Sequence, residues 1–310
     1  MNAGRRRFLG FALATAGTWA CCPAAGAASD PGVASASASA SGAGDGPRFR
    51  VAADGWGAAG AAEVEAVLRS AAGVLWRYFP GLKREPFVVL RGRDGPIVHY
   101  QRNVMGEIVM KLDTTDYLWC QYTYQFSHEF CHILCGFREQ AGNRNRWFEE
   151  TLCEAASLFV LRRLSDVWVE SAPYQGGREY APEFRRYAQT VMDSRSQVGN
   201  GRLGNFYLKN RKTLESTPRD RSLNGAMALP LLELLEGSPQ SWEAVAWLNS
   251  APAAEGDGFA EYLEKWRGAV PVRHREFVGE VMRRFGLRPG GAERAEPGAA
   301  GPTGPMHSRD

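Results

Sequence analysis

The chain has 310 residues, with 37 lysines and arginines against 34 acidic residues, and six cysteines. Residues 1–27 hold three of the arginines and no acidic residue, so the rest of the chain is formally neutral. This balance gives no support for binding to nucleic acid or to an anionic membrane, since both favour a basic surface. We therefore predict no nucleic-acid partner.

Residues 1–27 have the three regions of an export signal: a basic start, an apolar middle and a small-residue end. The run Arg5-Arg6-Arg7-Phe8-Leu9 matches the pattern Arg-Arg-x-Phe-Leu, which predicts a Tat-type signal peptide. The apolar middle is too short and too interrupted for a stable membrane span. A lipid anchor at Cys21 is the weaker alternative, because the residues before it match a lipobox poorly. The sequence thus predicts a bacterial protein that is periplasmic or secreted.

Two further segments lack the apolar residues that a core needs. Residues 28–46 are Ser/Ala/Gly repeats and are predicted to be a disordered leader, and residues 288–310, rich in Gly and Pro, a disordered tail. Residues 47–287 between them are long enough for one domain. We expect a sheet lobe at about 47–136 and a helical lobe at about 137–287.

The first lobe carries strand patterns around one helix pattern. Apolar residues at helical spacing predict a helix in residues 61–81, which ends at a Pro-Gly pair. Alternating or short apolar runs predict strands in residues 47–55, 86–93, 96–103 and 106–116.

The next predicted helix runs from Tyr117 to Gly136 and contains His128-Glu129-Phe130-Cys131-His132, an H-E-x-x-H motif. Residues four apart on a helix differ by about 40° around its axis, so both imidazoles leave from one face. Two such nitrogens can hold Zn²⁺ and leave its other side open. Glu129, offset by about 100°, can reach a metal-bound water without displacing it. Two unrelated surface histidines are the plainer interpretation of this motif alone.

A second helix, predicted to start near Trp147, places Glu150 and Glu154 four residues apart on one face. Glu150 can supply the third protein ligand that a catalytic zinc needs. Glu154 can accept the free N–H of a ligating imidazole. We expect Glu149, which points to another side of the helix, to be a solvated surface charge.

The rest of the chain is predicted to be mostly helical, with a long polar loop at 195–224. Pro230 is expected in the first turn of its helix, or at a kink. The predicted helices cover residues 181–194, 226–237, 241–250, 259–269 and 272–286.

The segments HEFCH (128–132) and WFEETLCE (147–154) together resemble the gluzincin metallopeptidases, over about 40 residues. In that group one helix carries H-E-x-x-H and the next carries a glutamate ligand. The resemblance implies a zincin-like α+β fold with one Zn²⁺ per chain, and three ligands in this sequence: His128, His132 and Glu150. It implies that Glu129 is the general base and that Glu154 supports an imidazole. The peptide substrate would lie along the sheet edge formed by Glu107–Leu112.

The resembling families also place a Tyr or His donor for the oxyanion just before a helix of the downstream lobe. Residues 218–225 (PRDRSLNG) contain neither. Tyr207 is our first candidate for this donor, with Arg221 and Asn224 behind it and Tyr180 and His274 lower still.

The sequence therefore predicts an exported zinc metallopeptidase that hydrolyses peptide bonds with a metal-activated water and Glu129 as base. One alternative keeps the fold and loses the catalysis: an inactive module that binds a peptide or cell-wall partner. Another is hydrolysis of an amide other than a peptide bond. The intact Glu129 argues against the inactive module, because a structural zinc has no need of that carboxylate.

Four cysteines remain after the predicted signal: Cys120, Cys131, Cys135 and Cys153. An oxidising compartment permits disulfides among them, in pairings that the sequence does not choose between. Small buried hydrophobic residues are the alternative role for these side chains.

Overall fold

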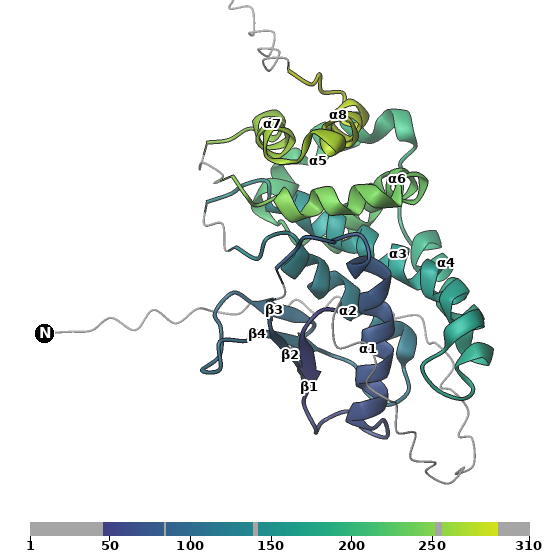
Figure 1. Cartoon of the computed structure of the whole chain (residues 1–310). Coiled ribbons are helices and arrows are strands. Elements are labelled where there is room, and N and C mark those ends of the chain that lie inside the picture. Colours follow the sequence, from purple (N-terminus) through teal and green to yellow (C-terminus); the bar gives the residue numbers. More distant parts are fainter. Residues whose placement is uncertain (1–45, 84, 139–141, 252–255, 291–310) are drawn as a thin grey trace, which may run out of the picture.

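The computed structural model describes residues 46–83, 85–138, 142–251 and 256–290 (Figure 1). The fold is α+β, with a small sheet at one end and helices in most of the remainder, so the predicted class is confirmed at this level. The predicted signal peptide (1–27), nearly all of the leader and most of the tail lie outside the described residues.

The sheet has four strands in the order β1-β2-β4-β3. Neighbours β1 (Phe49–Val51), β2 (Phe87–Arg91) and β4 (Ile108–Leu112) are parallel, whereas β3 (Ile97–His99) pairs antiparallel with β4. The prediction that residues 107–112 form the sheet edge was wrong. The turn after β3 contains Gly106 at φ 77° and reverses the chain, so β4 enters between β2 and β3 and leaves β3 at the edge.

Two helices, α1 (Ala61–Trp76) and α2 (Trp119–Leu134), pack against each other and against the sheet (Figure 1). The contact with α2 is made by aromatic rings. Phe49 stacks on Phe87 at 4.8 Å between centroids, and Phe126 of α2 lies 5.6 Å from Phe49. These rings are at least nine-tenths buried, so the sheet and the helix with the H-E-x-x-H motif share one apolar core.

Polar contacts fix the entry into α2. The backbone N–H of Asp113 donates to Gln125 Oε1 at 2.7 Å, and Gln125 Nε2 donates to the Asp113 carbonyl at 3.0 Å. Asp116 turns the chain at φ 56°, and its Oδ1 accepts from the N–H of Ala58 at 2.8 Å. The start of α2 is therefore tied both to the strand before it and to the segment before α1.

The longest helix, α3 (Arg146–Ser171), runs through the middle of the molecule between the sheet end and the remaining helices (Figure 1). It packs against α2, α4 (Gly177–Asp193) and α6 (Arg221–Gly237). All of its residues from Trp147 to Leu161 except Glu150 are buried, so this stretch belongs to the core, its other two glutamates included.

The helical end is completed by α5 (Leu203–Ser216), α7 (Phe259–Ala269) and α8 (Arg275–Arg284). The predicted long loop at 195–224 was therefore wrong, since α5 lies within it. Helix α6 also begins earlier than predicted, because the Asp220 side chain caps it by accepting from the N–H groups of Ser222 and Leu223 at 3.0 Å.

Two local predictions change with these boundaries. Pro230 lies in the middle of α6 and not in its first turn. The segment predicted as a helix at 241–250 forms a 3₁₀ helix, Pro239–Trp247. Among the described residues, none of the helices combines the length and the apolar character needed to cross a bilayer.

Candidate active site

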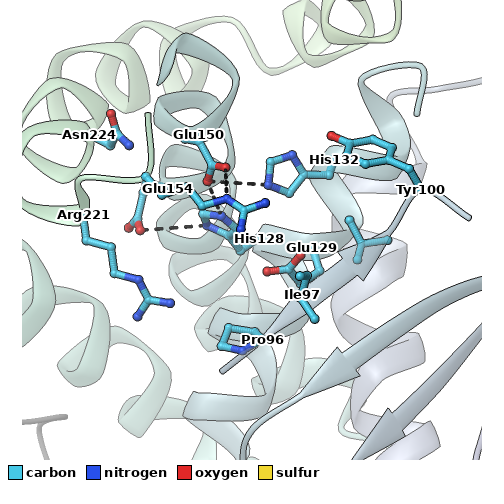
Figure 2. Close-up of a pocket in the computed structure, with 12 residues that line it drawn as sticks. Pro96, Ile97, Tyr100, His128, Glu129, His132, Glu150, Glu154, Arg221 and Asn224 are labelled. Atoms are coloured by element: carbon cyan, nitrogen blue, oxygen red, sulfur yellow. Dashed lines mark hydrogen bonds and ion pairs between the residues drawn. The ribbon is translucent and has the colours of Figure 1, made fainter. Parts of the chain in front are cut away.

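A pocket opens where α2, α3, the sheet edge and the start of α6 meet (Figure 2). Figure 2 shows Pro96, Ile97 and Tyr100 entering from the strand side, and Arg221 and Asn224 from the helical side. The motif residues lie between them. The lining from α2 and α3 consists of His128, Glu129, His132, Glu150 and Glu154. The structure thus brings together all five residues that the two sequence motifs singled out.

Three of these side chains converge on one point. The Nε2 atom of His128 lies 3.2 Å from Glu150 Oε2, and the Nε2 atom of His132 lies 3.7 Å from the same oxygen. The imidazole centroids are 5.2 Å apart and nearly perpendicular, at 68°. Two ring nitrogens and a carboxylate oxygen from two helices therefore face one another, as three ligands of one cation would.

The other nitrogen of each imidazole faces a second carboxylate. His132 Nδ1 lies 2.7 Å from Glu149 Oε1, and His128 Nδ1 lies 3.9 Å from Glu154 Oε1. The prediction for Glu149 was wrong: it is 8% exposed, and its Oε2 accepts from Asn249 Nδ2 at 2.9 Å. Each imidazole is thus held between an inner carboxylate and an outer one, an arrangement that fixes which nitrogen faces the pocket.

Glu154 is itself held by groups that the sequence did not reveal. Its Oε2 accepts a hydrogen bond from the Tyr124 hydroxyl, and Arg195 Nη2 lies 3.4 Å from the same oxygen. Arg195 lies so close to α6 that a Cβ on Gly225 would come within 2.5 Å of its Nε. The glycine therefore leaves the space through which Arg195 reaches Glu154.

The charges of the cluster shift its titration. Burial lowers the pKa of His132, but hydrogen bonds to Glu149 and Glu150 outweigh it and hold the pKa well above 6.5. The pKa of His128 is raised in the same sense, mainly by Glu150 and Glu129 against its burial. Burial alone would raise the pKa of Glu150, yet the two imidazoles hold it well below 4.5. Both shifts favour a protonated imidazole next to an ionised Glu150.

Glu129 differs from the other carboxylates of the site. It is 5% exposed and lines the pocket, but within the described part of the chain its carboxylate has no hydrogen-bond or ion-pair partner. Its oxygens are not among the fully buried unpartnered atoms, so they face the pocket space. A buried carboxylate that is open only to a pocket is available to accept a proton from a bound molecule.

The far wall of the pocket is formed by arginines and an amide. Arg219 Nε lies 3.3 Å from Glu150 Oε1, and Arg221 lines the pocket beside it. Asn224 also lines it, but its Nδ2 donates to the Pro218 carbonyl at 2.7 Å. Arg221 and Asn224 are thus at the pocket, as lower-ranked candidates for the oxyanion donor, whereas no pattern in the sequence points to Arg219.

Tyr207 is not among the residues that line this pocket. Its ring belongs to a buried aromatic cluster at the helical end. The ring centroid lies 5.1 Å from that of Trp147, 4.9 Å from that of Phe259 and 5.9 Å from that of Phe285. Tyr180 packs against Trp168 and Phe184. The structure therefore gives these tyrosines packing contacts instead of a place at the pocket.

The four cysteines in the described residues are buried, and none of them forms a disulfide. Cys120 stands apart, with its Sγ 3.3 Å from the Tyr180 hydroxyl. The Sγ atom of Cys153 lies within 4.8 Å of a ring nitrogen of both His128 and His132, which makes it a further donor atom near the imidazoles.

Comparison with known proteins gave no relative from which these residues could be assigned a role: no family model, curated protein or solved structure matches the chain.

Proposed function

We propose that this chain is an exported zinc-dependent peptidase with a zincin-like fold and a gluzincin-type ligand set: His128, His132 and Glu150. The observation that carries the proposal is the convergence of both Nε2 atoms on Glu150 Oε2, at 3.2 and 3.7 Å. Two imidazoles and one carboxylate form a standard ligand set for a catalytic zinc with an open position. Bound Zn²⁺ would act there as a Lewis acid toward a carbonyl and would lower the pKa of water to about 7.

Glu129 is the general base in this proposal. Its carboxylate faces the pocket and has no partner in the described residues, so it can take a proton from the attacking water and pass it to the leaving nitrogen. The supporting carboxylates have a different role. Glu149 and Glu154 accept from, or lie close to, the outer nitrogens of the imidazoles and keep their Nε2 atoms toward the pocket.

The substrate would lie along β3. This strand is an edge strand of the sheet, and the pocket is lined by Ile97 and Val98 of β3 and by Pro96 just before it. An extended peptide can add to such an edge by backbone hydrogen bonds, which bind it without demanding a particular side chain. On the opposite wall Arg221 would donate to the developing oxyanion, because it lines the pocket and its guanidinium is a charged hydrogen-bond donor. Export rests on the twin-arginine pattern of residues 1–27.

The test pairs metal content with activity. The chain from residue 28 onward is purified with its Glu129→Gln and Glu150→Ala variants, and bound zinc and cleavage of a mixed peptide library are measured. We expect one zinc per wild-type chain, retained in an inactive Glu129→Gln protein and lost in Glu150→Ala. Glu170→Gln, an exposed position on the same helix as Glu150, is the matched control and should behave as wild type.

Other outcomes redirect the proposal. Zinc binding without cleavage of any peptide would replace it with the inactive peptide- or wall-binding module, or with a hydrolase of another amide. Wild-type protein that binds no zinc would refute the ligand assignment.

A further inference from the structure

Three thiols meet in the core between α2 and α3, beneath the candidate active site. Cys131 and Cys135 lie one helical turn apart, at the end of α2 and at the residue that caps it, and Cys153 faces them from α3. Their exposed fractions are 1%, 0% and 0%. The three Sγ atoms all lie within 4.8 Å of one another.

The geometry is close to that of a three-sulfur metal site. A metal–sulfur bond of about 2.3 Å, in a trigonal arrangement, places the sulfurs roughly 4 Å apart. The three Sγ atoms all lie within 4.8 Å of one another, so this spacing is within the reach of small side-chain shifts. Buried cysteines that serve only as small hydrophobic residues have no need to gather in one place from two helices. We propose that Cys131, Cys135 and Cys153 form a second metal site, which takes a soft, thiophilic cation.

The chemistry of binding follows from the ligands. Three S–H bonds break, three metal–sulfur bonds form, and three protons leave to solvent without any change of oxidation state. Thiolate sulfur prefers soft cations over hard ones such as Mg²⁺ or Ca²⁺. A divalent soft cation leaves a single net negative charge, which lies near the imidazoles of His128 and His132. Because the thiols are buried, loading would accompany folding.

The site would cross-link the two helices that carry the proposed zinc ligands. Cys131 lies next to His132 in the sequence, and Cys153 lies between Glu150 and Glu154. A cation that binds only the folded chain stabilises it by mass action. Occupancy should therefore raise the unfolding temperature and hold α3 against α2, whether or not the chain is a peptidase.

The experiment refolds the full chain from denaturant under a phosphine reductant, with one equivalent of Zn²⁺ and increasing Cd²⁺. Bound cadmium and the near-ultraviolet thiolate-to-metal charge-transfer band are measured after desalting. We expect the band to saturate at one cadmium per chain. The double variant Cys131→Ser/Cys135→Ser should lose the band. Cys120→Ser is the matched control, a buried thiol on the same helix outside the cluster, and should keep it.

Three results would overturn the proposal: no charge-transfer band in the wild type, a band that survives in the double variant, or a disulfide among these thiols in place of metal uptake. The second result would mean that Cys153 binds together with the two imidazoles. X-ray absorption at the cadmium edge of the wild type decides independently of any variant, since three sulfur neighbours are expected. A band that persists in Glu150→Ala would separate this site from the proposed zinc centre.

Discussion

We expect the hydrogen bond between Glu149 and His132 to increase the affinity of the site for zinc, because it orients the His132 ring. His132 Nδ1 lies 2.7 Å from Glu149 Oε1, both side chains are buried, and Asn249 Nδ2 donates to the other carboxylate oxygen. In Glu149→Gln the amide oxygen can still accept from Nδ1, but the bond loses its charge, and an NH2 group replaces the oxygen that accepts from Asn249 Nδ2. Hydrogen bonds to charged groups contribute about 1.5–3 kcal/mol and neutral ones about 0.5–1.5 kcal/mol. The midpoints of these ranges differ by about 1.2 kcal/mol, which predicts roughly eightfold weaker zinc binding from the loss of charge alone.

Glu149→Ala should weaken zinc binding further, about 100-fold, because it removes the acceptor of both His132 Nδ1 and Asn249 Nδ2. The assay is competition for zinc against a chelating dye at fixed pH, with Glu170→Gln as the control on the same helix. Zinc affinity equal to wild type in both Glu149 variants, in a protein that loses zinc in Glu150→Ala, would refute the reasoning. It would mean that packing alone orients the His132 ring.

Two further predictions concern pH and the far wall. In the metal-free protein the raised pKa values of His128 and His132 stabilise the fold below about pH 6.5, and this contribution is lost as pH rises through them. The lowered pKa of Glu150 stabilises above about pH 4.5 and is lost as pH falls. The unfolding temperature of the metal-free protein should therefore be highest between about pH 4.5 and pH 6.5. A highest unfolding temperature above pH 7 would contradict this prediction. Arg221→Met should lower kcat about 100-fold and keep the zinc, whereas Tyr207→Phe should leave kcat unchanged. Steady-state kinetics measure both, and the reverse pattern would make Tyr207 the donor to the oxyanion.

The helical spacing of the two motifs predicted the inner part of the site because that part depends on local geometry. Residues four apart share a helix face wherever the helix lies, so the pairs His128/His132 and Glu150/Glu154 could be read from the sequence. The role of Glu149 could not. Which side of α3 meets His132 depends on how α2 and α3 cross, and that crossing is a property of the packed core.

Contacts between residues far apart in the sequence could not be predicted from it for the same reason. Arg195 meets Glu154 across 41 residues, and Asn249 meets Glu149 across 100. No periodicity marks either residue. The position of β3 at the sheet edge was missed because strand order follows from how the chain reverses after β3, whereas the patterns of alternating residues predict only that strands exist.

The way in which α2 and α3 cross thus decides which of their side chains meet at the site. One buried polar side chain helps to fix the position of α3 against α2. Ser157 is fully buried on α3, and its hydroxyl lies 2.9 Å from the Tyr124 carbonyl of α2 and 3.1 Å from the Cys153 carbonyl of its own helix. A hydroxyl has only one proton, so Ser157 shares it between the two carbonyls, and the contact with Tyr124 ties α3 to α2 at this position. A slide of α3 by one residue would move Glu150 by about 1.5 Å along the axis and about 100° around it. The convergence of Glu150 with both imidazoles therefore depends on this register as much as on the ligands.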